Sequence, residues 1–417
     1  MDGCDGGGGR GRVAGLQRRR GSSGDGNTDA TSSNPSGSNG NGSGGSAPSG
    51  GTTGETGGHA PAGSAGSGPG GTGSGGSIDP GECLGTTYFV APGGDDGNDG
   101  LAAASAFGTI QKGIDVAAPG DCVQLAAGDY PEDVVSKTHG TEAMPITIVG
   151  PAEAVLRGAG EGRVLQVHHD HLTFFGFTID GWDGSGDSAD TYQDKLVYAI
   201  GTEAGHGVTG LRLLHMTIEN AGGECVRLRY LATDCEIGWT TISRCGVHDF
   251  EYAGGGKNGE GVYIGTAPEQ LADGKNPTDE PDVSTGNWVH DCTFDTQGNE
   301  CVDIKEAATA NIVEHNDCTG QKDPESAGFD SRGSGNTFRF NQSHGNLGAG
   351  VRLGGDGEGD GVGNDVHENE LHDNAAGGIK FQRAPQGKVC GNVCSANAGG
   401  DAVGDFGEQF DPCAACP

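Results

Sequence analysis

Long apolar runs are missing from this 417-residue sequence, and no segment is long enough to span a membrane as a helix. The apolar core of a secretory signal peptide is missing as well. The glycine-rich runs lack the flanking strand and helix that a P-loop or a dinucleotide site requires. The cysteines form no pair of C-x2-C pairs at zinc-finger spacing. Nucleotide-binding motifs and zinc fingers are therefore excluded as the basis of function.

Basic residues are scarce, because 24 Lys and Arg stand against 58 Asp and Glu, for a net charge of −34. Such a chain has no bulk attraction for nucleic acids or anionic membranes, so we expect neither as a partner. Solubility or adaptation to salty surroundings explains the acidity most simply, and calcium loading is the alternative. An anionic ligand would need a local basic patch.

Glycine is abundant, with 85 residues, but without the collagen period. Residues 1–80 are mostly Gly, Ser, Thr, Asn and Pro and carry almost no large apolar side chain. They cannot bury enough surface to offset chain entropy, so we predict a disordered linker or surface tether before one folded domain at 83–412. Gly3-Cys4 resembles the end of a bacterial lipoprotein signal, and a lipid anchor at Cys4 and an accidental cysteine stay equally open.

The chain has 13 cysteines, of which only Cys4 lies in the predicted tether. An even, high number in the folded part indicates an oxidising, extracellular or cell-surface setting. Cys292 and Cys318 share an Asp-Cys-Thr context, so they form either a disulfide or a stack of buried thiols. Four cysteines near the C-terminus could staple a cap: Cys390, Cys394, Cys413 and Cys416.

A six-residue unit recurs along the second half of the chain, starting at residues 224, 260, 300, 327, 349 and 377. Each unit has a small or acidic residue, then usually Gly or Cys, then alternation between apolar and polar residues. Alternation with period two predicts a strand with one buried face. Repeats of this size, with one such strand each, predict a solenoid.

A second column of residues supports the solenoid. Four asparagines follow their strands in matching contexts: Asn316, Asn341, Asn369 and Asn392. Asparagine suits a turn because it tolerates strained backbone angles and bonds nearby backbone groups. Stacked coils would therefore carry an asparagine ladder, which we interpret as structural.

The N-terminal part of the folded region has a different pattern. Strands are expected at 88–90 and 145–150, and residues 107–118 place their apolar side chains on one helical face. This stretch resembles the entry of right-handed parallel β-helix proteins of the pectate-lyase-like superfamily, in which an amphipathic helix covers the open end. The first coil needs such a cover because its edge is unpaired. We therefore predict an all-β fold, a right-handed parallel β-helix with an N-terminal capping helix.

In each repeated unit the third and fifth residues should point inward and the fourth and sixth outward. Strands stack about 4.8 Å apart, so outward residues form columns. The fourth-position column is Arg227, Tyr263, Asp303, Asp330, Arg352 and Lys380; the sixth includes Arg229, Lys305 and Arg332. Exposed ion pairs, contributing about 0–1 kcal/mol each, are one interpretation. Cations gathered beside carboxylates in so acidic a protein favour a functional site.

Four segments carry a closer resemblance: GEGVYIG (259–265), NECVDIK (299–305), FDSRGSGNTFRFN (329–341) and AGVRLGG (349–355). Together they resemble polysaccharide lyase family six, the alginate lyase and chondroitinase B group. The resemblance implies Lys305 as catalytic base, Arg332 as its partner, and Glu300 as a calcium ligand with Asn258 or Glu260. Gly298 and Gly333 depart from the family's acid and histidine, so Asp303 or Asp330 would complete the metal site. Arg352, Tyr263 and Arg229 are the expected substrate-binding residues.

This chemistry is coherent for a uronic-acid glycan. β-Elimination removes a proton α to a carboxylate, and a cation on that carboxylate stabilises the developing charge. A lysine can take the proton if nearby cations lower its pKa, and arginine recognises a carboxylate with its fork of donors. We expect a secreted or surface-anchored, monomeric polysaccharide lyase-like protein that acts on an anionic polysaccharide with calcium.

Two alternatives remain open. Glu300, Asp303 and Asp330 could serve as acid and base of a glycoside hydrolase. The chain could also be a tethered, non-catalytic protein that binds glycans or calcium. A further cluster, His168, His169 and His171, could bind a metal ion, but histidines of a turn between strands are the favoured interpretation.

Overall fold

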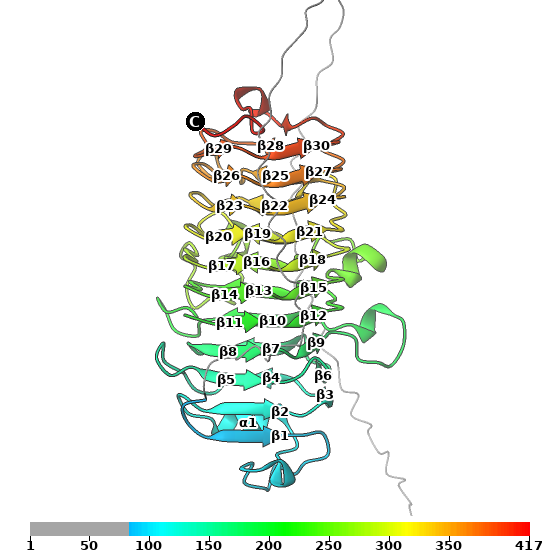
Figure 1. Cartoon of the computed structure of the whole chain (residues 1–417), viewed down its shortest axis with the longest axis vertical. Helices are drawn as coiled ribbons and strands as arrows, with labels where there is room; N and C mark the ends of the chain where they lie inside the picture. The colour runs from blue at the N-terminus through cyan, green and yellow to red at the C-terminus, as the bar shows by residue number, and fades with distance from the viewer. Residues whose placement is uncertain (1–82) are drawn as a thin grey trace, which may run out of the picture. The chain divides into compact units, whose positions relative to one another are not determined.

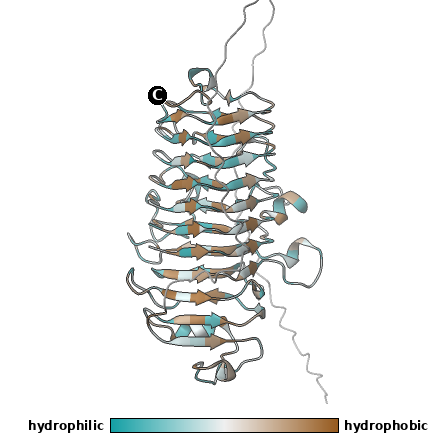
Figure 2. Ribbon diagram, in the orientation of Figure 1, coloured by the Kyte–Doolittle hydropathy of each residue, from teal (hydrophilic) through white to brown (hydrophobic). Residues whose placement is uncertain are grey.

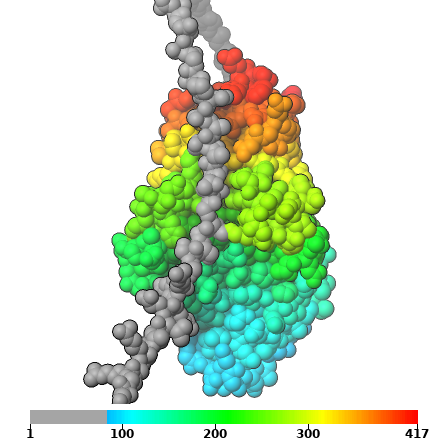
Figure 3. Space-filling view, turned by 180° about the vertical axis from the view of Figure 1, so that it is seen from behind, coloured from blue at the N-terminus to red at the C-terminus, as the bar shows by residue number. Residues whose placement is uncertain are grey.

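The computed structural model describes residues 83–417. The predicted tether and Cys4 lie outside these residues. The chain winds through three parallel sheets in turn, so that each coil adds one strand to each sheet (Figure 1). This is the predicted right-handed parallel β-helix. Seen from behind, the colours follow one another in bands from the first coils to the last, as coils stacked in chain order require (Figure 3).

The three sheets are named A, B and C here. Sheet A holds β1 Thr87–Val90, β2 Cys122–Leu125, β5 Ile146–Val149, β8 Leu172–Phe175, β11 Arg212–Leu214, β14 Glu236–Gly238, β17 Trp288–His290, β20 Ile312–Glu314, β23 Thr337–Arg339, β26 Asp365–His367 and β29 Val389–Cys390. Sheet B holds β3 Gly128–Pro131, β6 Ala154–Arg157, β9 Thr178–Asp180, β12 Thr217–Glu219, β15 Thr241–Ser243, β18 Thr293–Asp295, β21 Asp317–Thr319, β24 Gln342–His344, β27 Glu370–His372 and β30 Val393–Ser395. Sheet C holds β4 Val134–Val135, β7 Arg163–Val167, β10 Lys195–Ile200, β13 Val226–Arg229, β16 Val262–Ile264, β19 Val302–Ile304, β22 Ala327–Ser331, β25 Ala349–Leu353, β28 Ile379–Phe381 and β31 Ala402–Val403.

The inward-facing residues of all three sheets form one continuous apolar core. In the repeated units the third and fifth residues, such as Val302 and Ile304, are fully buried. Figure 2 shows hydrophobic and hydrophilic segments along the strands of successive coils. Burial of this apolar surface is the main stabilising contribution to a solenoid whose coils touch only their neighbours.

The helix α1, Ile110–Val116, covers the N-terminal end and packs on β1, β2 and β4. Thr109 caps it by accepting a hydrogen bond from the Lys112 N–H, and Ile110 and Ile114 are buried. The predicted capping helix is therefore confirmed. Short helical turns lie at η1 Ala103–Ser105, η2 Ala189–Thr191, η3 Val247–Glu251, η4 Pro268–Gln270 and η5 Gly407–Gln409. No helix within residues 83–417 has the length and apolarity that crossing a bilayer demands.

The asparagine ladder is confirmed, and it is one of three. The Oδ1 atom of Asn341 accepts hydrogen bonds from the Asn316 backbone N–H and Nδ2, both at 3.0 Å. Asn369 and Asn392 continue the same pattern between sheets A and B. The two other corners carry equivalent ladders: Asn287, Asn311, Asn336 and Asn364, and Gln321, Asn346, Asn374 and Asn397.

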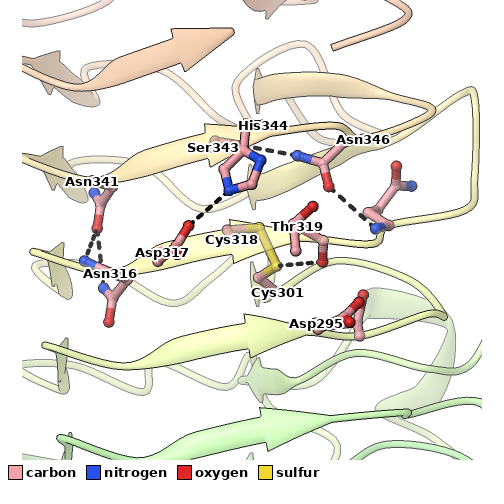
Figure 4. Close-up of a disulfide and its surroundings, with 12 residues drawn as sticks. Asp295, Cys301, Asn316, Asp317, Cys318, Thr319, Asn341, Ser343, His344 and Asn346 are labelled. Carbon is pink, nitrogen blue, oxygen red and sulfur yellow. Dashed lines mark hydrogen bonds and ion pairs between the residues drawn. A yellow bond between two sulfur atoms is a disulfide. The ribbon is translucent and has the colours of Figure 1, made fainter. Parts of the chain in front are cut away.

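Five disulfides lie within the described residues: Cys83–Cys122, Cys225–Cys245, Cys301–Cys318, Cys390–Cys416 and Cys394–Cys413. The last two staple the C-terminal cap as predicted. Cys318 pairs with Cys301, which closes one coil between its first strand and its last (Figure 4). A Cys292–Cys318 disulfide is therefore wrong, and Cys292 is a free, buried thiol, because a bond within one coil already occupies Cys318.

Candidate active site

The fourth positions of the repeated unit lie in register on sheet C. Strand pairing places Arg227, Tyr263, Asp303, Asp330, Arg352 and Lys380 beside one another in this order. The first five of these residues are buried, so the interpretation as exposed ion pairs is wrong. Charged groups out of water are costly unless they are paired. The column is therefore a dense buried cluster with both signs of charge.

Lys305 lies at the centre of this cluster. Its Nζ atom is 2.7 Å from Asp303 Oδ2 and 4.5 Å from the centre of the Tyr263 ring. Burial and Arg332 lower the pKa of Lys305, but Asp303, Tyr263 and Glu260 outweigh them, so the pKa stands above its ordinary value. In the chain by itself Asp303 therefore holds the proton on Nζ, and a pKa of Lys305 lowered by a metal ion together with Arg332 stays a prediction.

Arg332 extends from the next coil towards three carboxylates without a close bond to any of them. Its contacts are 3.6 Å to Glu306, 3.7 Å to Asp330 and 3.8 Å to Asp356, and its Nε atom donates no hydrogen bond. The side chain is 14% exposed. Ion-paired guanidinium donors usually lie nearer to their acceptors, at about 2.7–2.9 Å. Arg332 therefore keeps donors available for another carboxylate.

Arg352, one coil further, is held tightly. Its Nε atom donates to Asp330 Oδ1 at 3.1 Å, and its Nη1 approaches the Glu325 carbonyl at 3.5 Å. Burial raises the pKa of Asp330, and Arg352 and Arg332 only partly counter that effect. Asp330 is thus hydrogen-bonded to Arg352 and lies at a looser 3.7 Å from Arg332.

Three buried carboxylates from two neighbouring coils meet beside Lys305. One oxygen from each of Glu260, Glu300 and Asp303 lies within 4.8 Å of the other two. Ser326 Oγ donates to Glu300 Oε1, whereas Glu300 Oε2 and Asp303 Oδ1 have no hydrogen-bond donor among the described residues. Such oxygens, gathered and unsatisfied, fit a hard divalent cation such as Ca²⁺, which takes oxygen ligands.

The protonation of these carboxylates follows from their surroundings. Burial raises the pKa of Glu300 well above its usual range, and Asp303 and Asp330 add to the effect. Burial and then Glu224 raise the pKa of Glu260 to about 7. For Asp303, burial is outweighed by Lys305 and Arg332, so its pKa is lowered. Without a cation, their surroundings therefore favour the protonated forms of Glu260 and Glu300 and the charged form of Asp303.

Two predicted site residues lie elsewhere. The backbone N–H and Nδ2 of Asn258 both donate to Asp249, so this side chain does not join the carboxylate triad. Arg229 is buried under the insertion between β16 and β17, where it donates to Asn276 at 2.6 Å and to Asp273 at 2.8 Å. The structure does not bring Arg229 to Lys305, because the insertion occupies its donors.

Sequence reasoning missed several members of the cluster. Ser326 contacts Glu300, and the buried Glu306 faces Arg332. On β10, Lys195 Nζ lies 2.8 Å from Glu224 of the next coil. Strand pairing aligns residues 195–200 with the unit that starts at residue 224, so β10 is a further strand of the column, but its mostly apolar residues lack the alternation of the six units and so carry no periodic signal.

No protein-family model matches the sequence, and no curated protein matches it. Solved structures do match the fold. An alginate lyase from Paenibacillus sp. str. FPU-7 aligns with a TM-score of 0.57 and 19% identity, over 76% of this chain and 99% of that one. The pectate lyase Pel9A aligns with a TM-score of 0.55 and 12% identity, over 79% and 81%.

A hydrolase shares the architecture as well. A GH136 lacto-N-biosidase from Eubacterium ramulus aligns with a TM-score of 0.55 and 14% identity, over 76% of this chain and 66% of that one. At these identities the likeness establishes the pectate-lyase-like β-helix fold alone. One architecture hosts different chemistries, so function has to be argued from the site.

Proposed function

We propose that this chain is a secreted or surface-anchored polysaccharide lyase that cleaves a uronic-acid glycan by β-elimination. One observation carries the proposal: Lys305 and Arg332, on adjacent coils, share a buried cluster with the carboxylate triad. The alginate and pectate lyases that share the fold support it, and five disulfides support an oxidising compartment.

Arg332 binds the uronic-acid carboxylate. Its loose contacts with Glu306, Asp330 and Asp356 leave a guanidinium that can form a paired, bidentate contact with a planar anion. Arg352 favours the charged form of Asp330 and holds it in place, with the Arg332 Nε atom 3.7 Å away. The substrate carboxylate would thereby be held beside Lys305.

To act as a base, Lys305 must first release to solvent the proton that Asp303 holds on Nζ. The neutral Nζ then removes the proton α to the substrate carboxylate. The electron pair of that C–H bond forms the C=C double bond as the glycosidic C–O bond at the β carbon breaks, and the departing oxygen takes a proton from the solvent. Glu260, Glu300 and Asp303 would hold a calcium ion, and its charge would offset those carboxylates and stabilise the developing negative charge on the substrate. Tyr263, packed against Lys305, restricts the positions open to Nζ.

A second candidate function is glycoside hydrolysis. It is favoured by the carboxyl group of Glu260, whose pKa of about 7 suits an acid or base at neutral pH, beside Glu300, whose pKa is raised by burial. This reaction needs no neutral lysine. The non-catalytic glycan-binding function uses the same residues for recognition alone.

The test is ultraviolet absorbance of unsaturated products. The full chain is offered alginate, polygalacturonate and chondroitin or dermatan sulfate, with calcium and with chelator, and new reducing ends are measured in parallel. A calcium-dependent rise in absorbance that Lys305→Ala abolishes is the expected result. Lys388→Ala is the matched control, since Lys388 immediately precedes β29 of sheet A, with its Nζ atom 3.9 Å from Glu368, and does not belong to the cluster.

Each other outcome contradicts the proposal in a different way. Reducing ends without an absorbance rise would identify a hydrolase. An absorbance rise that survives Lys305→Ala would remove Lys305 from the mechanism. If neither signal appeared with any of these glycans, the protein would at most bind them. Measurements of glycan retention would then show whether it does.

A further inference from the structure

A second cluster of metal-ligating side chains lies at another corner of the coil, where sheet C leads to sheet A. His139 follows β4, Asp170 follows β7 and His206 follows β10, so three successive coils contribute one residue each. The candidate active site lies on later coils, from β16 to β25. The two clusters are therefore separate along the stack.

The two histidines converge on a single oxygen atom. His139 Nδ1 lies 3.0 Å and His206 Nε2 lies 3.1 Å from Asp170 Oδ2. The three ligand atoms all lie within 4.8 Å of one another. The histidine side chains are 51% and 48% exposed, so an ion could reach them from solvent.

The surroundings fix the carboxylate and one imidazole. The Thr209 backbone N–H donates to the other oxygen of Asp170 at 2.8 Å, which directs Oδ2 towards the histidines. His169 packs edge-on against His139, with ring centres 4.8 Å apart, and its own Nδ1 is 2.7 Å from Ser136 Oγ. Neighbours that orient a ligand in this way are typical of metal sites.

Hydrogen bonding by itself leaves a conflict at His139. The Asp170 backbone N–H points at His139 Nδ1 from 3.0 Å and needs a lone pair there. Asp170 Oδ2, at the same distance, needs a proton on the same nitrogen. No single protonation state of Nδ1 satisfies both neighbours, whereas a cation bound by both Nδ1 and Oδ2 would remove the need for that proton and would use the Nδ1 lone pair in place of the Asp170 N–H.

We propose that His139, Asp170 and His206 bind a divalent transition-metal ion, with Zn²⁺ as the best match. Two imidazole nitrogens and one carboxylate form a ligand set typical of zinc, with a fourth position open to water. The set differs from the all-oxygen triad at Glu300, which suits calcium. A bound ion would tie three coils together and stabilise the folded chain by mass action.

The experiment is a zinc titration of the full chain, expressed without a polyhistidine tag and stripped of metals. Calorimetry is performed in excess calcium, which saturates an oxygen-ligand site elsewhere. We expect one zinc ion per chain and a rise in melting temperature on binding. His206→Ala and His139→Ala should each weaken zinc affinity by about 100-fold or more, because the ion loses one of its direct ligands.

The matched control is His344→Ala. His344 also lies beside a carboxylate, 3.0 Å from Asp317, and stacks on His372, but it has no third ligand there. Zinc affinity should be unchanged in this variant. No zinc binding by the native chain would overturn the proposal, as would equal losses in His206→Ala and His344→Ala.

Cobalt gives a second readout that does not depend on stability. Co²⁺ in a site with nitrogen and oxygen ligands should produce visible absorption that zinc displaces and that His206→Gln lacks. Circular dichroism of each variant confirms that it is folded, and both histidines are half-exposed, so we expect native spectra. A cobalt spectrum unchanged in His206→Gln would place the ion elsewhere.

Discussion

Two kinds of buried polar stack run along the same coils, and they differ in how well their members are satisfied. In the ladder between sheets A and B, the side-chain oxygens of Asn341, Asn369 and Asn392 each accept two hydrogen bonds from the asparagine of the coil before. Figure 4 shows the pair between Asn316 and Asn341. On sheet C, Glu300 Oε2 and Asp303 Oδ1 are buried without a donor. Both stacks repeat from coil to coil, but of the two only the ladder has its side-chain oxygens hydrogen-bonded.

This difference in hydrogen bonding distinguishes a structural stack from a candidate functional one. A complete network stabilises the coil against its neighbours and needs nothing further. Buried carboxylate oxygens without donors cost free energy, and native chains retain few of them without a use. The sheet C cluster therefore has the unsatisfied carboxylates that the proposed cation site requires, whereas the ladder between sheets A and B is structural.

The largest expected effect is at Arg332. Arg332→Lys keeps the charge but loses the fork of donors, so we expect kcat/KM for glycan cleavage to fall by about 100- to 1000-fold with the melting temperature nearly unchanged. Arg339→Lys on sheet A, whose partner is Glu314, serves as the control. Equal losses in both variants would contradict a specific role for Arg332.

The next effect tests the ladder. Asn341→Ala removes the acceptor of two Asn316 donors and the donor to the Val313 carbonyl. The free energy of unfolding should fall by about 2–4 kcal/mol, measured by denaturant titration, with kcat unchanged. Asn397→Ala, at the half-buried end of a neighbouring ladder, should cost less than half as much. If Asn341→Ala lost activity without losing stability, the distinction between a structural ladder and a functional cluster would be contradicted.

A smaller effect concerns pH. Glu260 has a pKa raised from 4.5 to about 7 in the folded chain, so the folded state binds a proton that the unfolded state releases. Its contribution to stability is complete below pH 4.5 and is lost as pH rises through 7. Relative to Glu260→Gln, the native chain in chelator should therefore lose roughly 2 kcal/mol between pH 5 and 8. If the free energies of unfolding of the two proteins changed with pH in the same way, this prediction would be refuted.

The smallest expected effect is a gain in stability. Glu300→Gln keeps the shape of the side chain and its contact with Ser326 but removes an acid that Asp303 and Asp330 disfavour in its charged form. We expect the free energy of unfolding to rise by about 1 kcal/mol while calcium affinity falls. Glu314→Gln, which breaks a satisfied pair with Arg339, should lower stability instead. A destabilised Glu300→Gln would mean that the triad is structural.

The sequence by itself determined the coil. Alternation with period two, one asparagine per turn and an amphipathic segment at 107–118 predicted the strands, a ladder and the capping helix, and the structure has all three. These features are local and repeat with the chain, so each copy supports the same interpretation. The register of the sheet C column followed from them, because parallel strands align equivalent positions.

Only the tertiary structure decided what surrounds that column. Insertions of irregular length bury it and draw Arg229 to Asn276 and Asn258 to Asp249. The structure also set the charge on Lys305, since burial and Asp303 act on its pKa together. It brought His139 to His206 across two coils. No periodic pattern encodes these contacts, because they join loops whose separations along the chain differ from coil to coil.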